Sequence, residues 1–327
     1  MNTLPIVASP SGMPLFCWSF RRMAALLLML AGSLAVVRAQ AWLQTWMTAP
    51  EADKGAEVLY RRTLSLDARP QRAWITVATT GRYDLYVNGR NVSRCARLPL
   101  RPPYSTAAMA STHDITGLLR PGENTVLISA APTYYNIGAA ALSVTIFGDR
   151  ASGEPLLLSG TDGWFVRQGS RSLLAGGGES QDATREMLPW AEEDFRVMRW
   201  LPAKSLDNNL EDSVRYLSKA EEGESIVLVG RPHHFNAKGD TVTYDFGTAF
   251  HGFLRVTLRG CRRGERISIG GLEYTCTGEL DEQAFRRWTA TDLRRITISG
   301  SGGFRRNQIQ SVEAIVLGTR PRSTDFR

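Results

Sequence analysis

The alternation of apolar and polar residues constrains this chain more than any other feature. A period of two recurs in the apolar sets Tyr83/Leu85/Val87, Leu142/Val144/Ile146, Leu254/Val256/Leu258, Ile267/Ile269 and Ile296/Ile298. Such alternation is typical of strands with one buried and one solvated face. Turn signals at short intervals separate these sets: Asn88-Gly89, Pro121-Gly122, Ser152-Gly153, Asp162-Gly163, Arg263-Gly264 and Ser301-Gly302-Gly303. Asn88-Gly89 predicts a type I′ hairpin, because both turn residues need positive φ. The pattern predicts an all-β protein.

Only two stretches compete as helices. Residues 114–119 could form a single turn, and residues 206–220 are polar without an apolar stripe, so we expect them to link two domains. An all-β chain of 327 residues divides most easily into two sandwiches, each large enough to bury a core. We predict two β-sandwich (jelly-roll, galactose-binding-like) domains in tandem. The predicted ranges are 40–205 for the first sandwich, 206–225 for the linker, 226–320 for the second sandwich and 321–327 for a tail.

Residues 1–39 resemble a secretory signal peptide. Arg21-Arg22 precedes an apolar run from Met23 to Val37, which is short for a membrane span. Val37-Arg38-Ala39 offers small residues at the positions before cleavage, which would leave Gln40 as the new N-terminus. The alternative is an uncleaved anchor. We expect a secreted, periplasmic or cell-surface protein with no membrane span after cleavage.

The net charge gives little support to nucleic-acid binding. Removal of residues 1–39 takes away Arg21, Arg22 and Arg38 and no acidic residue, so the net charge falls from +7 to +4. Four arginine pairs are dispersed among turns and strand starts: Arg262-Arg263, Arg286-Arg287, Arg294-Arg295 and Arg305-Arg306. We expect them at solvated strand ends, with a patch for an acidic polymer as the alternative.

Three cysteines follow the predicted signal: Cys95, Cys261 and Cys276. An odd count outside the cytoplasm leaves at least one thiol unpaired. Along a straight strand Cys261 and Cys276 would lie about 50 Å apart, whereas a disulfide needs Cα atoms within about 7 Å. A bridge would require the chain to double back, for which Gly270-Gly271 is a candidate turn. The pairing stays open at this point.

An ordered set of segments resembles the N-terminal and middle β-sandwich (accessory) domains of bacterial alpha-L-rhamnosidases. These segments are Trp46-Met47-Thr48-Ala49-Pro50, Gly81-Arg82-Tyr83-Asp84-Leu85-Tyr86-Val87-Asn88-Gly89, Asp114-Ile115-Thr116-Gly117-Leu118-Leu119, Asp162-Gly163-Trp164, Trp200-Leu201-Pro202-Ala203 and Tyr244-Asp245-Phe246-Gly247. Glycosidases with galactose-binding-like accessory domains share several of these turns and are the competing resemblance. The family's D-A-R arginine is replaced here by Thr184, with Arg185 one place late.

The resemblance implies an accessory module more than an enzyme. The (α/α)6 barrel that carries the family's catalytic carboxylates should begin near Gly318, and ten residues follow Leu317. Glycoside hydrolysis needs two carboxylates about 5–10 Å apart across a cleft. The acidic runs at 192–194, 211–212 and 281–282 are contiguous and polar, so we predict no catalytic residue. Galactose-binding-like sandwiches often hold a structural Ca²⁺, but no run of Asp and Asn marks a site here. We predict no cofactor.

Sugar binding needs an aromatic face and a few polar groups that orient hydroxyls. The candidate carbohydrate-binding residues are Trp190, Glu179, Asp182, Tyr134, Tyr135, Trp164, Arg101 and Tyr104. For Glu179 and Asp182 a structural role in a long loop is the alternative. We assign Trp74 and Trp200 to packing.

Three functional hypotheses follow. The first is a non-catalytic protein that binds a glycan, such as a rhamnoside-containing polysaccharide, and assists its capture or degradation. The second is a structural module that packs on a separately encoded glycoside hydrolase or surface complex, and it predicts an exposed apolar patch in the second domain. The third is a truncated or weak alpha-L-rhamnosidase.

Overall fold

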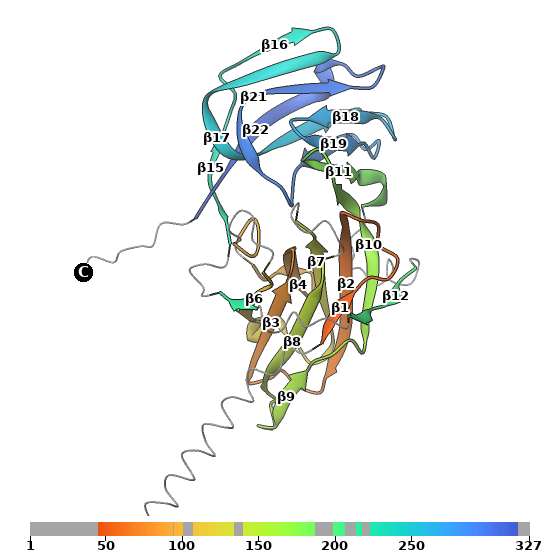
Figure 1. The fold of residues 1–327 in the computed structure, drawn as a ribbon, viewed down its shortest axis with the longest axis vertical. Helices are drawn as coiled ribbons and strands as arrows, with labels where there is room; N and C mark the ends of the chain where they lie inside the picture. The colour runs from red at the N-terminus through yellow and green to blue at the C-terminus, as the bar shows by residue number, and fades with distance from the viewer. Residues whose placement is uncertain are drawn as a thin grey trace, which may run out of the picture. The chain divides into compact units, whose positions relative to one another are not determined.

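The protein is built almost wholly from β-strands, as predicted (Figure 1). The computed structural model describes residues 45–93, 95–100, 107–133, 140–186, 199–206, 214–217 and 223–319. These residues belong to one compact unit that spans 43–327. Within them, helical structure is limited to the short 3₁₀ turns η2 (Thr116–Leu118), η3 (Ala183–Arg185) and η6 (Arg306–Gln308).

The strands form two sheets. The smaller sheet has seven strands, β1 (Trp46–Thr48), β3 (Arg72–Thr79), β6 (Met109–Asp114), β8 (Leu142–Asp149), β9 (Pro155–Leu158), β13 (Lys204–Leu206) and β14 (Arg215–Tyr216). Its main path runs β13-β1-β8-β3-β6-β14, and β9 pairs with β8.

The larger sheet has fifteen strands. In chain order they are β2 (Ala56–Leu66), β4 (Arg82–Val87), β5 (Arg90–Asn91), β7 (Gly122–Ala131), β10 (Trp164–Leu173), β11 (Glu179–Asp182), β12 (Leu201–Pro202), β15 (Ser225–Gly230), β16 (His234–Lys238), β17 (Thr241–Arg259), β18 (Arg266–Ile269), β19 (Leu272–Thr275), β20 (Asp281–Phe285), β21 (Thr291–Gly300) and β22 (Ile309–Gly318). Its main path runs β15-β22-β17-β21-β18-β19-β11-β10-β2-β7-β4-β5.

A first hydrophobic core lies between the seven-stranded sheet and the strands β10, β2, β7 and β4. Side chains at alternate positions point into it, including Tyr60 of β2, Leu85 of β4 and Ile75 of β3. The strand β8 departs from simple alternation because Ser143 on its other face is also buried. Ser143 pairs with Ala78, which belongs to a small apolar cluster on that outer face. This sheet is therefore covered on both sides.

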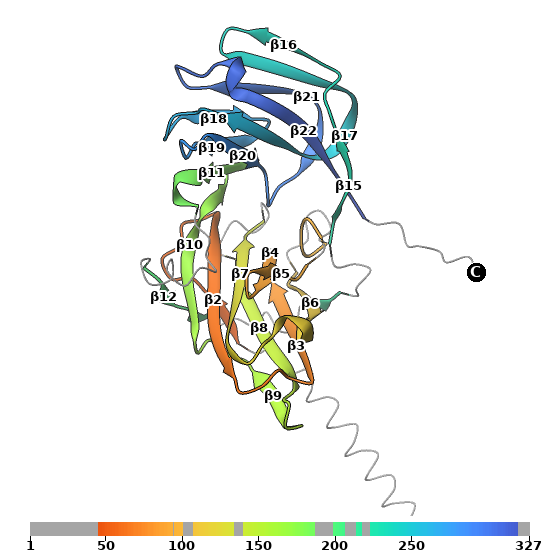
Figure 2. The ribbon, with the colours of Figure 1, turned by 180° about the vertical axis from the view of Figure 1, so that it is seen from behind.

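The long strand β17 contributes to both layers of strands around the second core. Its first part pairs with β16 and β21, and its last part pairs with β20 and β22 (Figure 2). The register shifts between Asp245 and Phe250, where Gly247 has φ +74°. Glycine adopts this conformation without the steric penalty of a Cβ. Val242 on one part and Val256 on the other are both fully buried in the same core.

One strand joins the two cores. The strand β11 pairs antiparallel with β10 of the first core and parallel with β19 of the second. The larger sheet is consequently continuous, and Ala183, next to β11, is buried in the second core. The predicted first domain, 40–205, thus contains a segment that packs on the second core. The predicted linker lies largely outside the described residues, and the domain boundaries stay predictions.

The predicted turns are found where the glycines indicated them. Asn88 (φ 51°) and Gly89 (φ 76°) connect β4 to β5 as a two-residue hairpin. Gly270 and Gly271 reverse the chain between the antiparallel strands β18 and β19. The predicted helical turn at 114–119 is the 3₁₀ turn η2.

Candidate functional site

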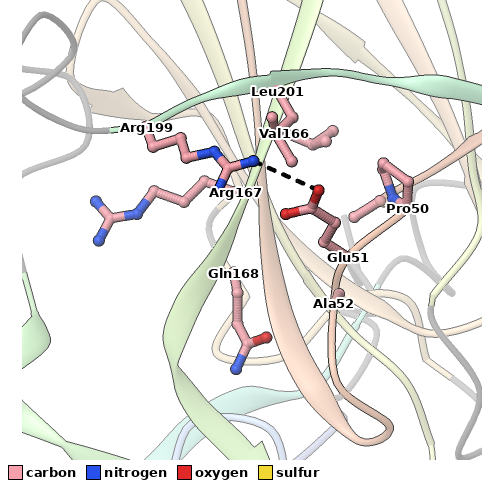
Figure 3. Close-up of a pocket in the computed structure, with 9 residues that line it drawn as sticks. Pro50, Glu51, Ala52, Val166, Arg167, Gln168, Arg199 and Leu201 are labelled. Atoms are coloured by element: carbon pink, nitrogen blue, oxygen red, sulfur yellow. Dashed lines mark ion pairs between the residues drawn. The ribbon is translucent and has the colours of Figure 1, made fainter.

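A small open pocket with a mixed apolar and polar lining lies beside β10 (Figure 3). Its volume is about 120 Å³. It is lined by Ala49, Pro50, Glu51, Ala52, Val166, Arg167, Gln168, Arg199 and Leu201. This volume is below the roughly 300–1,000 Å³ of pockets that enclose a drug-sized ligand. The pocket therefore suits part of a ligand, such as one ring of a longer chain.

Strand pairing and one side-chain contact position the walls of this pocket. Leu201 of β12 lies opposite Val166 of β10 in the antiparallel register. The segment after β1 is held against β10 by Gln168, whose amide oxygen accepts from the backbone N–H of Asp53 at 3.1 Å. The Gln168 amide nitrogen also donates to the Asp53 carboxylate at 3.0 Å. The pairing of β12 with β10 and the hydrogen bonds between Gln168 and Asp53 thus fix the walls of the pocket.

The rim of the pocket carries an exposed ion pair. The guanidinium of Arg199 and the carboxylate of Glu51 lie 3.6 Å apart and point toward one another (Figure 3). Their side chains are 77% and 61% exposed. An exposed pair of this kind contributes little to stability. The ion pair can therefore break at a small cost in free energy, which leaves both groups able to form hydrogen bonds with the hydroxyls of a ligand.

The pocket's chemistry suits binding more than hydrolysis. Arg199 and Gln168 offer N–H donors and Glu51 offers acceptors, while Pro50, Val166 and Leu201 supply an aliphatic surface. Among the described residues that line it, Glu51 is the one carboxylate. A glycosidase site needs two carboxylates.

Glu179, a predicted sugar ligand, is fully buried where the two cores meet. Its carboxylate accepts from the backbone N–H groups of Arg287 (3.0 Å), Trp288 (2.8 Å) and Thr289 (2.6 Å) and from the Thr289 hydroxyl (2.7 Å). The guanidinium of Arg171 lies 3.6 Å away. These contacts direct the carboxylate toward the 287–289 turn and away from solvent.

Asp182 and Trp164 also make structural contacts. The Asp182 carboxylate accepts from the Thr184 N–H (3.2 Å) and hydroxyl (2.6 Å), which caps η3. Trp164 is 1% exposed within the first core, and the Arg62 guanidinium lies 6.0 Å from its ring centre. Trp74, which we assigned to packing, stacks on Phe147 with ring centres 5.7 Å apart.

The other five predicted residues, Trp190, Tyr134, Tyr135, Arg101 and Tyr104, lie outside the described residues. Their role in sugar binding stays a prediction. The sequence analysis did not single out Glu51 or Arg199. Glu51 and Arg199 are close together because β12 pairs with β10, and no local sequence pattern predicts that pairing.

The prediction that Arg286-Arg287 lies at a solvated strand end is wrong. Arg286 is 4% exposed and donates to the Thr289 hydroxyl at 2.8 Å. Arg287 donates to the Asp84 carboxylate at 2.6 Å and to the Tyr86 hydroxyl at 2.7 Å. Burial lowers the pKa of Arg287, but the charge of the Asp84 carboxylate and its hydrogen bond to Arg287 favour the protonated form and raise the pKa overall. Arg286 is buried against the turn after β20, and Arg287 is largely buried because it connects that turn to β4 of the first core.

Neither a metal cluster nor a membrane-spanning helix is found in the part of the chain that the structure describes. No group of three or more His, Cys, Asp or Glu residues there is placed to hold a metal ion. Within the same ranges, no helix has the length and apolar character needed to span a membrane.

Part of the chain matches a known protein family. Residues 68–153 match the alpha-L-rhamnosidase N-terminal domain. The matched segment covers most of the first core, from β3 through β8. It confirms the resemblance that the sequence motifs indicated.

Curated relatives agree with this match. The chain is 30% identical over 163 residues to an alpha-L-rhamnosidase of Streptomyces avermitilis, covering 44% of this chain and 15% of the relative. It is 24% identical over 268 residues to an alpha-L-rhamnosidase of Formosa agariphila, covering 72% of this chain and 28% of the relative. The chain thus spans less than a third of these relatives.

Solved structures extend the similarity in fold to both cores. An alpha-L-rhamnosidase from Dictyoglumus thermophilum aligns with TM-score 0.72 at 19% identity, over 85% of this chain and 36% of that chain. An alpha-L-rhamnosidase from Streptomyces avermitilis, complexed with L-rhamnose, aligns with TM-score 0.69 at 22% identity, over 81% and 29%. The shared fold is a tandem of β-sandwiches that forms one part of these longer chains.

Proposed function

We propose that this protein is a non-catalytic carbohydrate-binding module that acts outside the cytoplasm and assists the capture or degradation of rhamnose-containing glycans. The observation that carries the proposal is the pocket beside β10, in which Glu51 and Arg199 flank an aliphatic surface. The similarity to alpha-L-rhamnosidases supports the choice of sugar.

The pocket matches the two sides of a deoxy sugar. A 6-deoxyhexose such as rhamnose presents a methyl group and C–H bonds on one side and hydroxyls on the other. Pro50, Val166 and Leu201 can cover the apolar side, while Glu51 accepts from hydroxyls and Arg199 donates to them. Because the pocket is small and open, we expect weak binding of a single ring.

Gel electrophoresis in the presence of a polysaccharide tests this proposal. We expect rhamnogalacturonan in the gel to retard the protein, and the double variant Glu51→Gln/Arg199→Gln to lose most of the retardation. Glu154→Gln changes an exposed glutamate outside the pocket and should behave as wild type. Absence of retardation by any polysaccharide would reject carbohydrate binding. Release of nitrophenol from an aryl α-L-rhamnoside above a boiled control would reject the non-catalytic part of the proposal.

A second candidate function is an interaction module that packs on a separately encoded glycoside hydrolase or surface complex. It is favoured by β15, where four consecutive apolar side chains are exposed: Ile226 (53%), Val227 (51%), Leu228 (60%) and Val229 (46%). In the described residues β15 pairs with β22 along one edge. Exposed apolar strands at a sheet edge are typical of interaction surfaces.

Size-exclusion chromatography distinguishes this second function. We expect Leu228→Lys to reduce self-association or co-purification with a hydrolase. Leu280→Lys is the matched control, because Leu280 is 70% exposed and lies outside β15. If the wild type and both variants elute as monomers and no hydrolase co-purifies, the interaction-module function is rejected.

A further inference from the structure

Two cysteines lie together inside the second core. Cys261 is 5% exposed and Cys276 is fully buried, and both belong to the same hydrophobic cluster. The third described cysteine, Cys95, packs against the first core. Cys261 and Cys276 carry free thiols in this structure.

The β18–β19 hairpin brings Cys261 and Cys276 together. Cys261 immediately precedes a tight turn, in which the Glu265 N–H donates to the Arg262 carbonyl at 2.9 Å. Cys276 follows β19 and pairs with the end of this turn. Its N–H donates to the Glu265 carbonyl, and its carbonyl accepts from the Gly264 N–H, both at 2.9 Å. The segment that carries Cys276 therefore runs directly beside the turn that follows Cys261.

The side chains of these cysteines face one another. The two thiols contact one another, and this contact lowers the pKa of Cys261 and raises that of Cys276. The Gln308 amide also donates to the Cys261 sulfur at 3.6 Å. Cys261 is the slightly more accessible of the two cysteines.

We propose that Cys261 and Cys276 form a disulfide that closes the β18–β19 hairpin when the chain meets a low-molecular-weight disulfide. Deprotonated Cys261 attacks one sulfur of that oxidant and releases one thiolate, which leaves a mixed disulfide. Cys276 then loses its proton and attacks the Cys261 sulfur, and the second thiolate leaves. Two cysteines are oxidised, one external disulfide is reduced to two thiols, and the two thiolates take up the two protons.

Burial determines when this exchange can occur. Both sulfurs are enclosed in the folded second core, so we expect the disulfide to form during folding and to resist reductant afterwards. The inference is independent of sugar binding. It agrees with the predicted signal peptide, because disulfides persist in oxidising compartments.

Peptide mapping tests the disulfide directly. The full chain is refolded in reduced and oxidised glutathione, alkylated without reduction, and digested with trypsin. We expect a cross-linked pair of peptides, 260–262 and 267–286, that separates after reduction. Recovery of these peptides as separately alkylated or glutathione-bound species would overturn the proposal. Because the wild-type chain is mapped, this result does not depend on whether a variant folds.

Thermal unfolding gives a second readout with a matched control. In Cys95→Ser, which leaves the pair intact, we expect the oxidised form to melt roughly 5–10 °C above the reduced form, because the bond closes a loop of about 15 residues. We expect Cys276→Ser to abolish both this difference and the cross-linked peptide. An oxidised Cys95→Ser chain that melts with the reduced one would contradict a stabilising cross-link.

Discussion

The Arg287 guanidinium donates to the Asp84 carboxylate at 2.6 Å, which joins residues 203 positions apart in the chain. Asp84 lies on β4 of the first core, and Arg287 follows β20 of the second. Their side chains are 8% and 22% exposed. This ion pair and the Glu179 contacts make the junction between the two cores a buried polar network.

Loss of the Asp84 charge should destabilise the protein. Asp84→Asn leaves the largely buried Arg287 without its counter-charge, so we expect a loss of about 3 kcal/mol in the free energy of unfolding, measured by urea denaturation. Asp281→Asn is the control, because Asp281 forms a solvent-exposed pair with Arg259 and its loss should cost far less stability. Equal losses in the two variants would contradict a special role for the buried pair.

Glu179→Gln should also be strongly destabilising. The substitution keeps the side chain's shape but replaces one acceptor oxygen with a donor group facing backbone N–H groups, and it removes the charge beside Arg171. We expect a cost of about 3 kcal/mol. Glu273→Gln changes an exposed side chain of β19 and should cost less than about 0.5 kcal/mol. A Glu179→Gln chain as stable as wild type but deficient in glycan binding would restore Glu179 as a ligand.

Stability should decrease in mild acid because of His113. This side chain is buried against the Tyr83 hydroxyl, with Nε2 at 2.7 Å, and burial lowers its pKa from 6.5 to about 4. Above about pH 6.5 the imidazole is neutral in both states and contributes no pH dependence. As the pH falls from about 6.5 to about 4, the unfolded chain takes up the proton first, so up to about 3 kcal/mol of stability is lost.

Comparison of variants isolates this contribution. The difference in free energy of unfolding between wild type and His113→Gln should change between pH 7 and pH 4.5. If the difference between wild type and His113→Gln stays constant over this range, His113 does not titrate as described.

Gly247→Ala should destabilise the second core. Gly247 has φ +74°, and an added Cβ would lie 3.3 Å from the His233 ring. We expect a cost of about 1–2 kcal/mol by thermal or urea unfolding. Gly302→Ala is the matched control, because its Cβ would meet open space and its φ is not in the left-handed region. Similar stability of the two variants would show that β17 does not need glycine at its bend.

Local signals predicted much of the fold. The alternation of Leu254, Val256 and Leu258 predicted their burial, since a strand places alternate residues on one face. Asn88-Gly89 predicted a hairpin because left-handed turn positions restrict the residue type. These features depend on neighbours along the chain.

The contacts between distant segments could not be predicted in this way. Glu179 meets residues 287–289, more than a hundred positions away, through the parallel pairing of β11 with β19. Arg287 is largely buried for the same reason, although adjacent arginines are typical of a solvated surface. The candidate pocket depends likewise on the pairing of β12 with β10. Pairing between strands that are distant in the chain cannot be predicted from the local patterns of a single sequence.

A glycan array probed with the full chain, its Glu51→Gln/Arg199→Gln variant and Glu154→Gln tests the central claim most directly. The account predicts that wild type and Glu154→Gln bind rhamnose-containing glycans and that the pocket variant does not. A signal that is absent for wild type, or unchanged in the pocket variant, would contradict it.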